Sequence, residues 1–346
     1  LNGVHAKGSP FELYVRHNVA YGPQSRLITD IASVGFSEPF VNFGNTFTAQ
    51  LVDEMGNDMK TSSYPYNPVV TADISSDFGP VSGSVAMNGD GTFTVTYSPR
   101  STGEQQLTVV VNGEEIIGSP FTVNVQSADL TGSTSVASGA GLSSAMAGVE
   151  ASFVVEARDL EGNTREFADG AGFVGVLTMV TVSTRPPDFD QMVNSNWGSS
   201  EVVNCVSVHS GGTDGLYTLS YNATISGDYS LAVTSVTDNQ PISGSPFSVT
   251  VVPNVASGTE SIITGSGTRT GTAGVLEPIE IYLRDVFDNH LYAGGDRVRV
   301  ESVLVSGHHE NTWESVGREA RIDVVNGLLY GDDEQDSLAA VGITEA

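Results

Sequence analysis

The tetrapeptide Gly-Ser-Pro-Phe occurs three times, at Gly8–Phe11, Gly118–Phe121 and Gly244–Phe247. The copies extend to GSPFELYV, GSPFTVNV and GSPFSVTV, so an apolar side chain returns at every second position after the phenylalanine. A period of two places these side chains on one face of a β-strand. Proline is tolerated at a strand start because it has no N–H to give to a ladder. Each copy is therefore predicted to open a strand.

The spacing of the copies sets the size of the repeating unit. They begin 110 and 126 residues apart, which is the length of a small β-sandwich domain rather than of a short solenoid repeat. Turn sequences such as Asp53–Asn57 (DEMGN) and Asn88–Gly91 (NGDG) separate short alternating stretches. Glycine and asparagine tolerate the positive φ that tight turns require. The sequence therefore predicts an all-β chain of tandem, immunoglobulin-like, seven-strand sandwiches.

Four segments follow from these markers. Residues 1–16 are expected to be the last strand of a preceding unit, and residues 25–126 a complete unit. A second complete unit spans 133–253, with an insert at about 184–201, and residues 260–346 form a third unit that lacks its last strand. The strands expected in the first complete unit are Arg26–Ser33, Thr46–Val52, Val69–Ile74, Val81–Met87, Thr92–Tyr97, Gln105–Val111 and Ser119–Val125.

Charge and composition exclude several functions. The 41 acidic residues outnumber the 14 basic ones and give a net charge of −27, and a surface this acidic repels phosphate backbones, so nucleic acid is not an expected partner. No apolar stretch approaches the roughly 18 residues that a membrane-spanning helix needs. The acidity is expected to keep a repetitive β-protein soluble and to discourage edge-to-edge association. Cys205 is the only cysteine, so no disulfide forms within this stretch.

A family resemblance covers essentially the whole chain. The repeat turns at Asp-x-x-Gly-Asn, continues through a hairpin such as Asp90–Pro99 (DGTFTVTYSP) and closes with Ile-x-Gly-Ser-Pro-Phe-x-Val. In this order of motifs it resembles the filamin/ABP280 repeat. The resemblance implies immunoglobulin-like domains joined in a rod, acting as spacers and partner-binding modules. Similar repeats also occur in large surface proteins of protists and algae.

The resemblance also implies a binding edge. In filamins the edge formed by the third and fourth strands accepts an added peptide strand. The corresponding positions are in the first complete unit: Val69, Thr71, Asp73, Val81, Val85 and Met87.

Four further residues are candidates for partner contact, glycosylation or nucleophilic chemistry. Trp197 and Trp313 lie in variable regions and either anchor a neighbouring domain or partner or cover the local core. Asn222 heads an Asn-Ala-Thr glycosylation sequon. Cys205 lies on an apolar alternating stretch, where packing is favoured over a role as nucleophile.

Three histidines and the Asp-rich turns are candidate metal ligands. The histidines at 290, 308 and 309 give poor geometry for one ion, because adjacent strand residues point to opposite faces. The Asp-rich turns contain calcium-ligand chemistry, but turns favour these residues without any ion. No cofactor or metal is therefore expected.

The sequence thus favours a non-enzymatic structural or scaffolding segment of a tandem-repeat rod or filament, because no nucleophile elbow, phosphate loop or zinc helix is present. The alternative is a cell-surface adhesion or peptide-binding module that uses the third/fourth-strand edge or the insert. Expected partners are neighbouring repeats, other copies of the chain and peptide strands.

Two modes of assembly are compatible with the sequence. Ser9–Val15 of one chain completing residues 260–346 of the next would build a filament, whereas a window on a longer array needs no such exchange. The low lysine count with many Ser, Thr and Gly favours an extracellular, cell-surface or flagellar setting over the cytoplasmic cytoskeleton.

Overall fold

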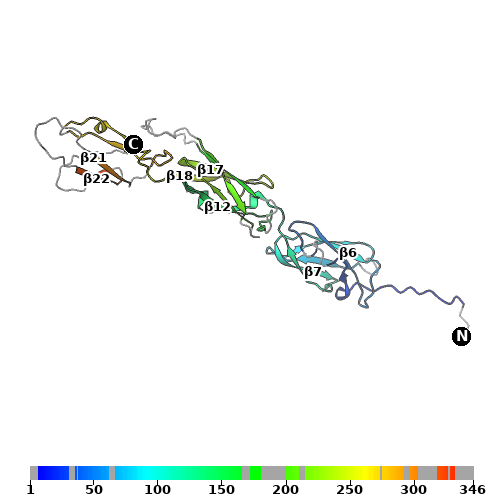
Figure 1. The fold of residues 1–346 in the computed structure, drawn as a ribbon. Helices are drawn as coiled ribbons and strands as arrows, with labels where there is room; N and C mark the ends of the chain where they lie inside the picture. Colours follow the sequence, from blue (N-terminus) through cyan, green and yellow to red (C-terminus); the bar gives the residue numbers. More distant parts are fainter. Residues whose placement is uncertain are drawn as a thin grey trace, which may run out of the picture.

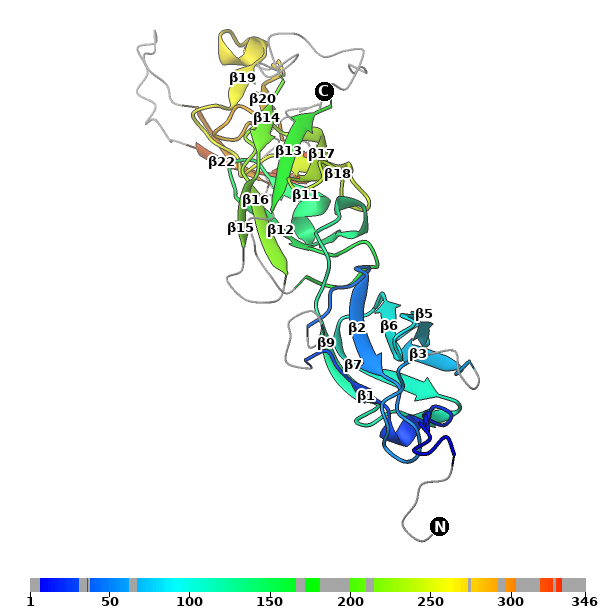
Figure 2. The ribbon, with the colours of Figure 1, turned by 90° about the vertical axis from the view of Figure 1, so that its right-hand side faces the viewer.

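A computed structural model describes residues 7–30, 36, 38–61, 67–165, 172–180, 200–209, 215–272, 275–291, 296–302, 318–325 and 328–331. These residues fold into β-strands joined by turns and a few short 3-10 helices. The predicted all-β class is confirmed. Two sandwiches and a third β region follow one another in line, with the amino-terminal residues at one end (Figure 1). The order is the same when the molecule is turned by 90° (Figure 2).

Strands β1 to β9 form the first sandwich. One sheet has the order β1-β2-β6-β5, and the other has the order β4-β3-β7-β8 with β9 also paired to β7. The strands are β1 Arg26–Leu27, β2 Asn45–Gln50, β3 Val70–Ile74, β4 Val81–Ser82, β5 Ser84–Met87, β6 Thr92–Tyr97, β7 Gly103–Val111, β8 Glu114–Glu115 and β9 Phe121–Val125. A 3-10 helix, η1 (Gly22–Gln24), precedes β1.

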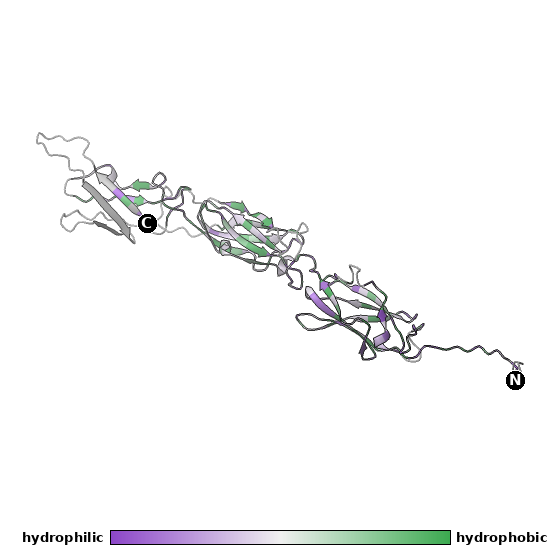
Figure 3. Cartoon of the chain, turned by 60° about the horizontal axis from the view of Figure 1, so that its bottom comes forward, coloured by the Kyte–Doolittle hydropathy of each residue, from purple (hydrophilic) through white to green (hydrophobic). Residues whose placement is uncertain are grey.

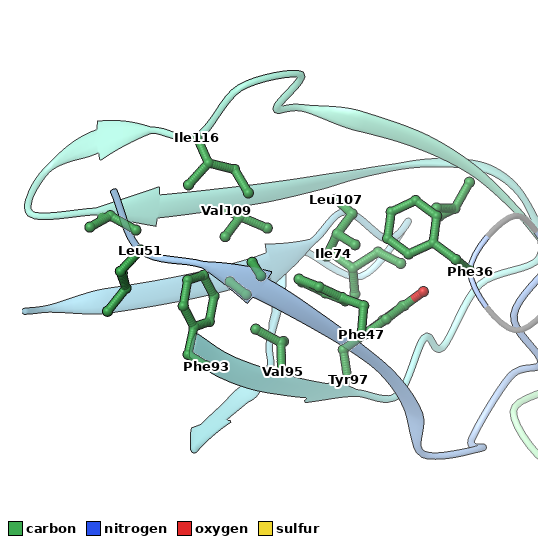
Figure 4. Packing of buried hydrophobic residues seen from close by; sticks show 14 of the residues in the cluster. Phe36, Phe47, Leu51, Ile74, Phe93, Val95, Tyr97, Leu107, Val109 and Ile116 are labelled. Carbon is green, nitrogen blue, oxygen red and sulfur yellow. The ribbon is translucent and has the colours of Figure 1, made fainter. Parts of the chain in front are cut away.

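The core of the first sandwich lies between its sheets. In β6 the side chains of Phe93, Val95 and Tyr97 are buried, as the alternation predicts. Figure 4 shows them meeting side chains from the facing sheet, among them Leu107 and Val109. Each large apolar side chain buried in this way stabilises the fold by about 1.5–3 kcal/mol.

The marker strand β9 closes this core. Val123 and Val125 are buried and alternate with exposed residues. Phe121 packs edge-on against Phe36, with ring centroids 5.7 Å apart. The phenylalanine of the tetrapeptide therefore covers the end of the core rather than pointing into water.

One predicted strand is divided in the structure. Residues 81–87 were expected to be continuous, but β4 pairs with β3 in one sheet and β5 pairs with β6 in the other. Gly83 lies at the crossing, where its N–H donates to the carbonyl of Ala72 over 2.7 Å. A Cβ on Gly83 would lie 3.0 Å from the carbonyl oxygen of Thr96. The chain can change sheets here because glycine leaves room for the neighbouring backbone.

Strands β10 to β18 form the second sandwich, with sheets β10-β12-β16-β15 and β11-β18-β17-β13-β14. Hydrophobic and hydrophilic segments share its strands (Figure 3). Its elements are η2 Gly132–Thr134, β10 Val136–Ser138, η3 Ala140–Leu142, β11 Ser144–Met146, β12 Ala151–Glu156, β13 Phe173–Met179, β14 Val202–Asn204, β15 Val206–His209, β16 Leu216–Tyr221, β17 Gly227–Ser235 and β18 Phe247–Val252.

The third β region contains two small sheets. Strands β19 (Ile262–Thr264) and β20 (Glu280–Tyr282) pair with each other, with η4 (Ser266–Thr268) after β19. The other sheet has the order β21 (Arg297–Ser302), β22 (Arg318–Val325) and β23 (Leu328–Gly331). Val325 of β22 lies opposite Leu328 of β23. Residues 326–327 and 332–346 lie outside the described residues.

The first copy of the tetrapeptide lies outside both sandwiches. Residues 11–15 belong to no strand in the described structure, and Phe11 is 75% exposed. Val15, at the position equivalent to the buried Val125 of β9, is likewise exposed. Among the described residues, no helix is long and apolar enough to span a bilayer.

Candidate functional site

The predicted binding edge is open at the start of β3. Asn112 donates its N–H to the carbonyl of Val69 in the ladder with β7, so Val70 and Ala72 turn their backbone groups to the opposite side. Gly83 pairs with Ala72 there, and β4 continues from Asp73. Among the described residues, no strand pairs with Val70 on this side. A strand added here would pair with the start of β3.

The six predicted edge residues divide between the two sheets. Val69, Thr71 and Asp73 belong to the outer face of β3, where Val69 is 67% exposed. Val81 and Val85 are half-buried against the core, on β4 and β5 respectively. Met87 is exposed near the end of β5. The edge therefore presents β3 from one sheet beside β5 from the other, and its binding role stays a prediction.

The second sandwich has the same edge, which the sequence analysis did not find. Cys205 donates its N–H to Gly175 over 2.8 Å, as Gly83 does to Ala72, and β14 covers β13 only from Val176 onward. Phe173 and Val174 are left without a strand on this side among the described residues. The insert hid the correspondence, because 30 residues separate Gly175 from Cys205 and only 11 separate Ala72 from Gly83.

The other candidate residues are not brought together into one site. Trp197 and Trp313, with the histidines at 308 and 309, lie outside the described residues. Asn222 is exposed in the loop between β16 and β17. Cys205 is half-buried, and burial raises the pKa of its thiol to about 11. In the described part of the chain no three His, Cys, Asp or Glu side chains gather as metal ligands.

Buried aspartates organise the two Asp-x-x-Gly-Asn turns and the related turn at Asp285, in which Asp288 replaces the glycine. Asp53, Asp159 and Asp285 are at most 1% exposed. Each accepts the backbone N–H of a linker residue just before its own unit, from Asn18 at 2.9 Å, Ala128 at 3.2 Å and Asn254 at 2.8 Å respectively. Burial alone would raise the pKa of Asp53, but the N–H groups of Asn18 and Asn57 lower it below its usual value. These carboxylates fasten the linkers to the turns.

At the first joint, the turn of the second sandwich meets the end of the first. The Asn163 amide donates to the carbonyl of Arg100 over 3.0 Å. Glu161 accepts hydrogen bonds from the side chains of Asn42 and Arg100, both over 2.9 Å. The hydrogen bond from the Asn42 amide is the largest cause that lowers the pKa of Glu161, and the hydrogen bond from Arg100 lowers it further. This joint is polar and contains an ion pair.

At the second joint, an equivalent amide makes an equivalent bond. Asn289 donates to the carbonyl of Thr224 over 2.8 Å, and its own side-chain oxygen accepts the N–H of Ser226 over 2.8 Å. Asn289 is 2% exposed. Phe287 packs against the core cluster of the second sandwich. This joint is apolar where the first one is charged.

Glu201 supports the loop that receives Asn289. Its carboxylate accepts the N–H groups of Thr224 and Ile225 and the hydroxyl of Tyr229, the last over 2.6 Å. Burial alone would raise the pKa of Glu201, but these hydrogen bonds, led by that of Tyr229, lower it. Burial is the main cause that raises the pKa of Tyr229, and the hydrogen bond to Glu201 raises it further. Glu201 was expected only as the end of the insert.

Replacing Glu201 by glutamine is expected to destabilise the second sandwich by about 1–2 kcal/mol at pH 7, because hydrogen bonds to a charged acceptor are replaced by weaker ones. The folded-state pKa lies below the ordinary 4.5. The contribution is therefore full above pH 4.5 and is lost as the pH falls through the lowered pKa. Urea unfolding of both proteins at pH 7 and pH 3 measures it. A difference that does not shrink at pH 3 contradicts the prediction.

The comparison with known families completes this picture of sandwiches joined in line. A family model described as Filamin/ABP280 repeat matches residues 29–122 and 130–248. The chain belongs to the filamin/ABP280 repeat family. The two sandwiches are thus filamin repeats. The chain is 30% identical over 179 residues to Filamin-A of Drosophila melanogaster, a match that covers 51% of this chain and 7% of that protein.

Solved structures with similar folds include bacterial surface proteins. FdeC, an Escherichia coli adhesin, shares 20% identity over 84% of this chain and 82% of its own, with a TM-score of 0.44. Invasin, a bacterial integrin-binding protein, shares 14% identity over 88% of this chain and 57% of its own, with a TM-score of 0.40. The Lin-41 filamin domain shares 23% identity over 31% of this chain and 96% of its own, with a TM-score of 0.26.

The joint residues of these filamin repeats were missed at the sequence level. The turn motif was recognised, but Glu161 and Phe287 are its variable third residues and carry no motif signal. Arg100 and Asn42 lie 61 and 119 residues from Glu161 in sequence. Aligning the three turns by their aspartates would have exposed the third position, but not what faces it.

Proposed function

We propose that this segment is a structural spacer that holds its filamin repeats in line and fixes the distance between whatever is attached to either end. The observation that carries this proposal is the repeated fastening at both joints. A buried aspartate binds the linker backbone, and the asparagine of the same turn binds a loop carbonyl of the preceding repeat. Two bonds of this kind resist both swivelling and bending of one repeat on the next.

Small-angle X-ray scattering of the whole chain tests the spacer role. We expect a pair-distance distribution with the long tail of an extended particle. The joint variant Asn163→Ala with Asn289→Ala is expected to shorten that tail, because bent conformers become populated. Its control is Val255→Ala, which changes an exposed linker side chain without removing the turn amides. A wild-type chain that is already compact contradicts the spacer role.

A second candidate function is peptide binding at the repeat edge. It is favoured by the unpaired start of β3 beside the exposed Val69, and by the same opening at Phe173 in the second repeat. An extended peptide with apolar side chains at alternate positions is the expected occupant, since main-chain hydrogen bonds supply affinity and alternate side chains supply specificity.

Substitution of Val70 by proline tests this binding. Proline removes the N–H on the open side of β3 and leaves the ladder with β7 intact, as edge strands tolerate. Titration with an octapeptide of alternating valine and threonine is followed by NMR. We expect shifts at β3 and β5 in the wild type and in the control Thr71→Val, and at least about tenfold weaker binding in Val70→Pro. Equal affinity of both variants contradicts strand addition.

A further inference from the structure

The two repeats present an equivalent corner to their successors. In the first repeat, Asn42 has a φ of 56° and donates its N–H to Pro99 over 2.9 Å. In the second repeat, Gly148 has a φ of 75° and donates its N–H to Ala223 over 2.8 Å. Backbone direction and hydrogen bonding agree, so these residues hold the same position. One has a polar side chain, and the other has none.

The third residue of the next turn faces this corner. Glu161 accepts the amide of Asn42 at the first joint. At the second joint the ring of Phe287 fills the space over Gly148, where a Cβ would lie 2.1 Å from the ring edge. A side chain at the corner and an aromatic ring in the turn therefore exclude each other. The two positions differ together from one joint to the other.

The second flank of the corner differs in the same sense. Arg100 pairs with Glu161 at the first joint, and the carboxylate is 18% exposed between its two donors. Thr224, at the equivalent loop position, offers only its backbone carbonyl to Asn289. Met55, the third residue of the first turn, is 74% exposed. Of the two apolar third residues, Phe287 is half-buried against the glycine corner at Gly148, whereas Met55 is exposed.

We propose that the corner residue and the third turn residue form a matched pair that decides which filamin repeats stack and how each joint responds to salt. An asparagine corner flanked by arginine accepts a repeat whose turn carries a carboxylate. A glycine corner accepts a repeat whose turn carries a large apolar side chain. The first joint is accordingly a salt-sensitive hinge and the second a salt-insensitive one. The inference rests on the proposed spacer role for its purpose, but it is tested joint by joint.

Salt separates the two joints. Spin labels report each joint by pulsed electron paramagnetic resonance in the whole chain with Cys205→Ala. The exposed label positions are Ser84→Cys with Ser207→Cys for the first joint and Ser207→Cys with Thr270→Cys for the second. An exposed ion pair contributes up to about 1 kcal/mol and is screened over about 3 Å in 1 M salt. We expect NaCl at about 1 M to lower the closed-to-open ratio of the first joint about two- to fivefold. The second joint should not change.

Glu161→Gln is expected to abolish that salt response, because the amide keeps the contact with Asn42 and removes the charge facing Arg100. Among the described residues, the carboxylate of Asp159 also lies at this joint, where it binds the linker backbone. A salt response that survives in Glu161→Gln, or one of equal size at the second joint, overturns the proposal.

A steric exchange tests the pairing itself. Gly148→Asn is expected to lower the closed-to-open ratio of the second joint about tenfold, as overpacking a fitted contact does. Asparagine is chosen because it tolerates positive φ, as Asn42 shows. Adding Phe287→Glu is expected to restore much of the closure, and Val286→Glu at the exposed neighbour serves as control. Failure of the double variant to recover overturns the pairing rule.

Failure of the pairing rule can be distinguished from unfolding of the variant and from failure of the spacer role. Thermal unfolding shows whether Gly148→Asn keeps its second repeat folded. If it does not, Phe287→Ala opens the joint without touching the corner and carries the same expectation. A wild-type chain with both joints closed but without selective responses supports the spacer and rejects the pairing. A wild-type chain with both joints open rejects both.

Discussion

Gly91→Ala is expected to destabilise the first repeat by about 3 kcal/mol or more, because the backbone must move to admit the methyl group. Gly91 has a φ of 93°, and a Cβ there would lie 1.9 Å from the carbonyl oxygen of Met59. The carbonyl of Gly91 also accepts the N–H of Leu51 and the amide of Gln50. The tip of this hairpin is therefore packed against the segment that flanks the Asp53–Asn57 turn. Urea unfolding of the whole chain, followed by tyrosine fluorescence and NMR of the first repeat, measures the loss.

Gly89 provides the matched control, two residues away in the same hairpin. Its φ is 83°, but nothing lies within 4 Å of its Cβ position. Gly89→Ala therefore reports only the cost of positive φ, about 1 kcal/mol. The difference between the variants isolates the contact with Met59. Equal destabilisation by both would show that conformation alone, and not the close approach, governs this hairpin.

Asp159→Ala is expected to have the second large effect. It should lower the free energy of unfolding by about 2–3 kcal/mol, because the N–H groups that donate to Asp159 lose their acceptor. The carboxylate is fully buried and binds the N–H groups of Ala128, Glu161 and Asn163. Asn163 is the residue that reaches the first repeat. The loss should therefore appear in the second repeat and also as a looser first joint.

Asp129→Ala is the control for this change. It removes one negative charge from the same linker, but the side chain is exposed. Chemical denaturation gives the stability change, and the distance distribution between the labels at Ser84→Cys and Ser207→Cys gives the joint. Equal stability of Asp159→Ala and Asp129→Ala would mean that the turn does not depend on its buried carboxylate.

Much of the fold was predictable because its determinants are local. The alternation in Thr92–Tyr97 predicted the strand and the buried residues of β6 without error at either end. The division of residues 81–87 was not predictable, because the alternation continues across Gly83 and only packing against Thr96 separates β4 from β5. For the predicted binding edge, the sequence therefore named the residues but not the sheet to which each belongs.

The conformation of the Gly-Ser-Pro-Phe tetrapeptide follows from its own residues. Gly8 has a φ of 91°, and a Cβ built on it would lie 3.3 Å from the Phe11 ring, although no described sandwich surrounds it; Gly118 and Gly244 have the same geometry inside folded repeats. Neighbouring residues suffice for such a shape. How the repeats join depends instead on the folded chain, because Gly148 and Phe287 are more than a hundred residues apart in sequence and meet only in space. Turn motifs set each backbone corner, and the fit between side chains from different repeats sets the joint.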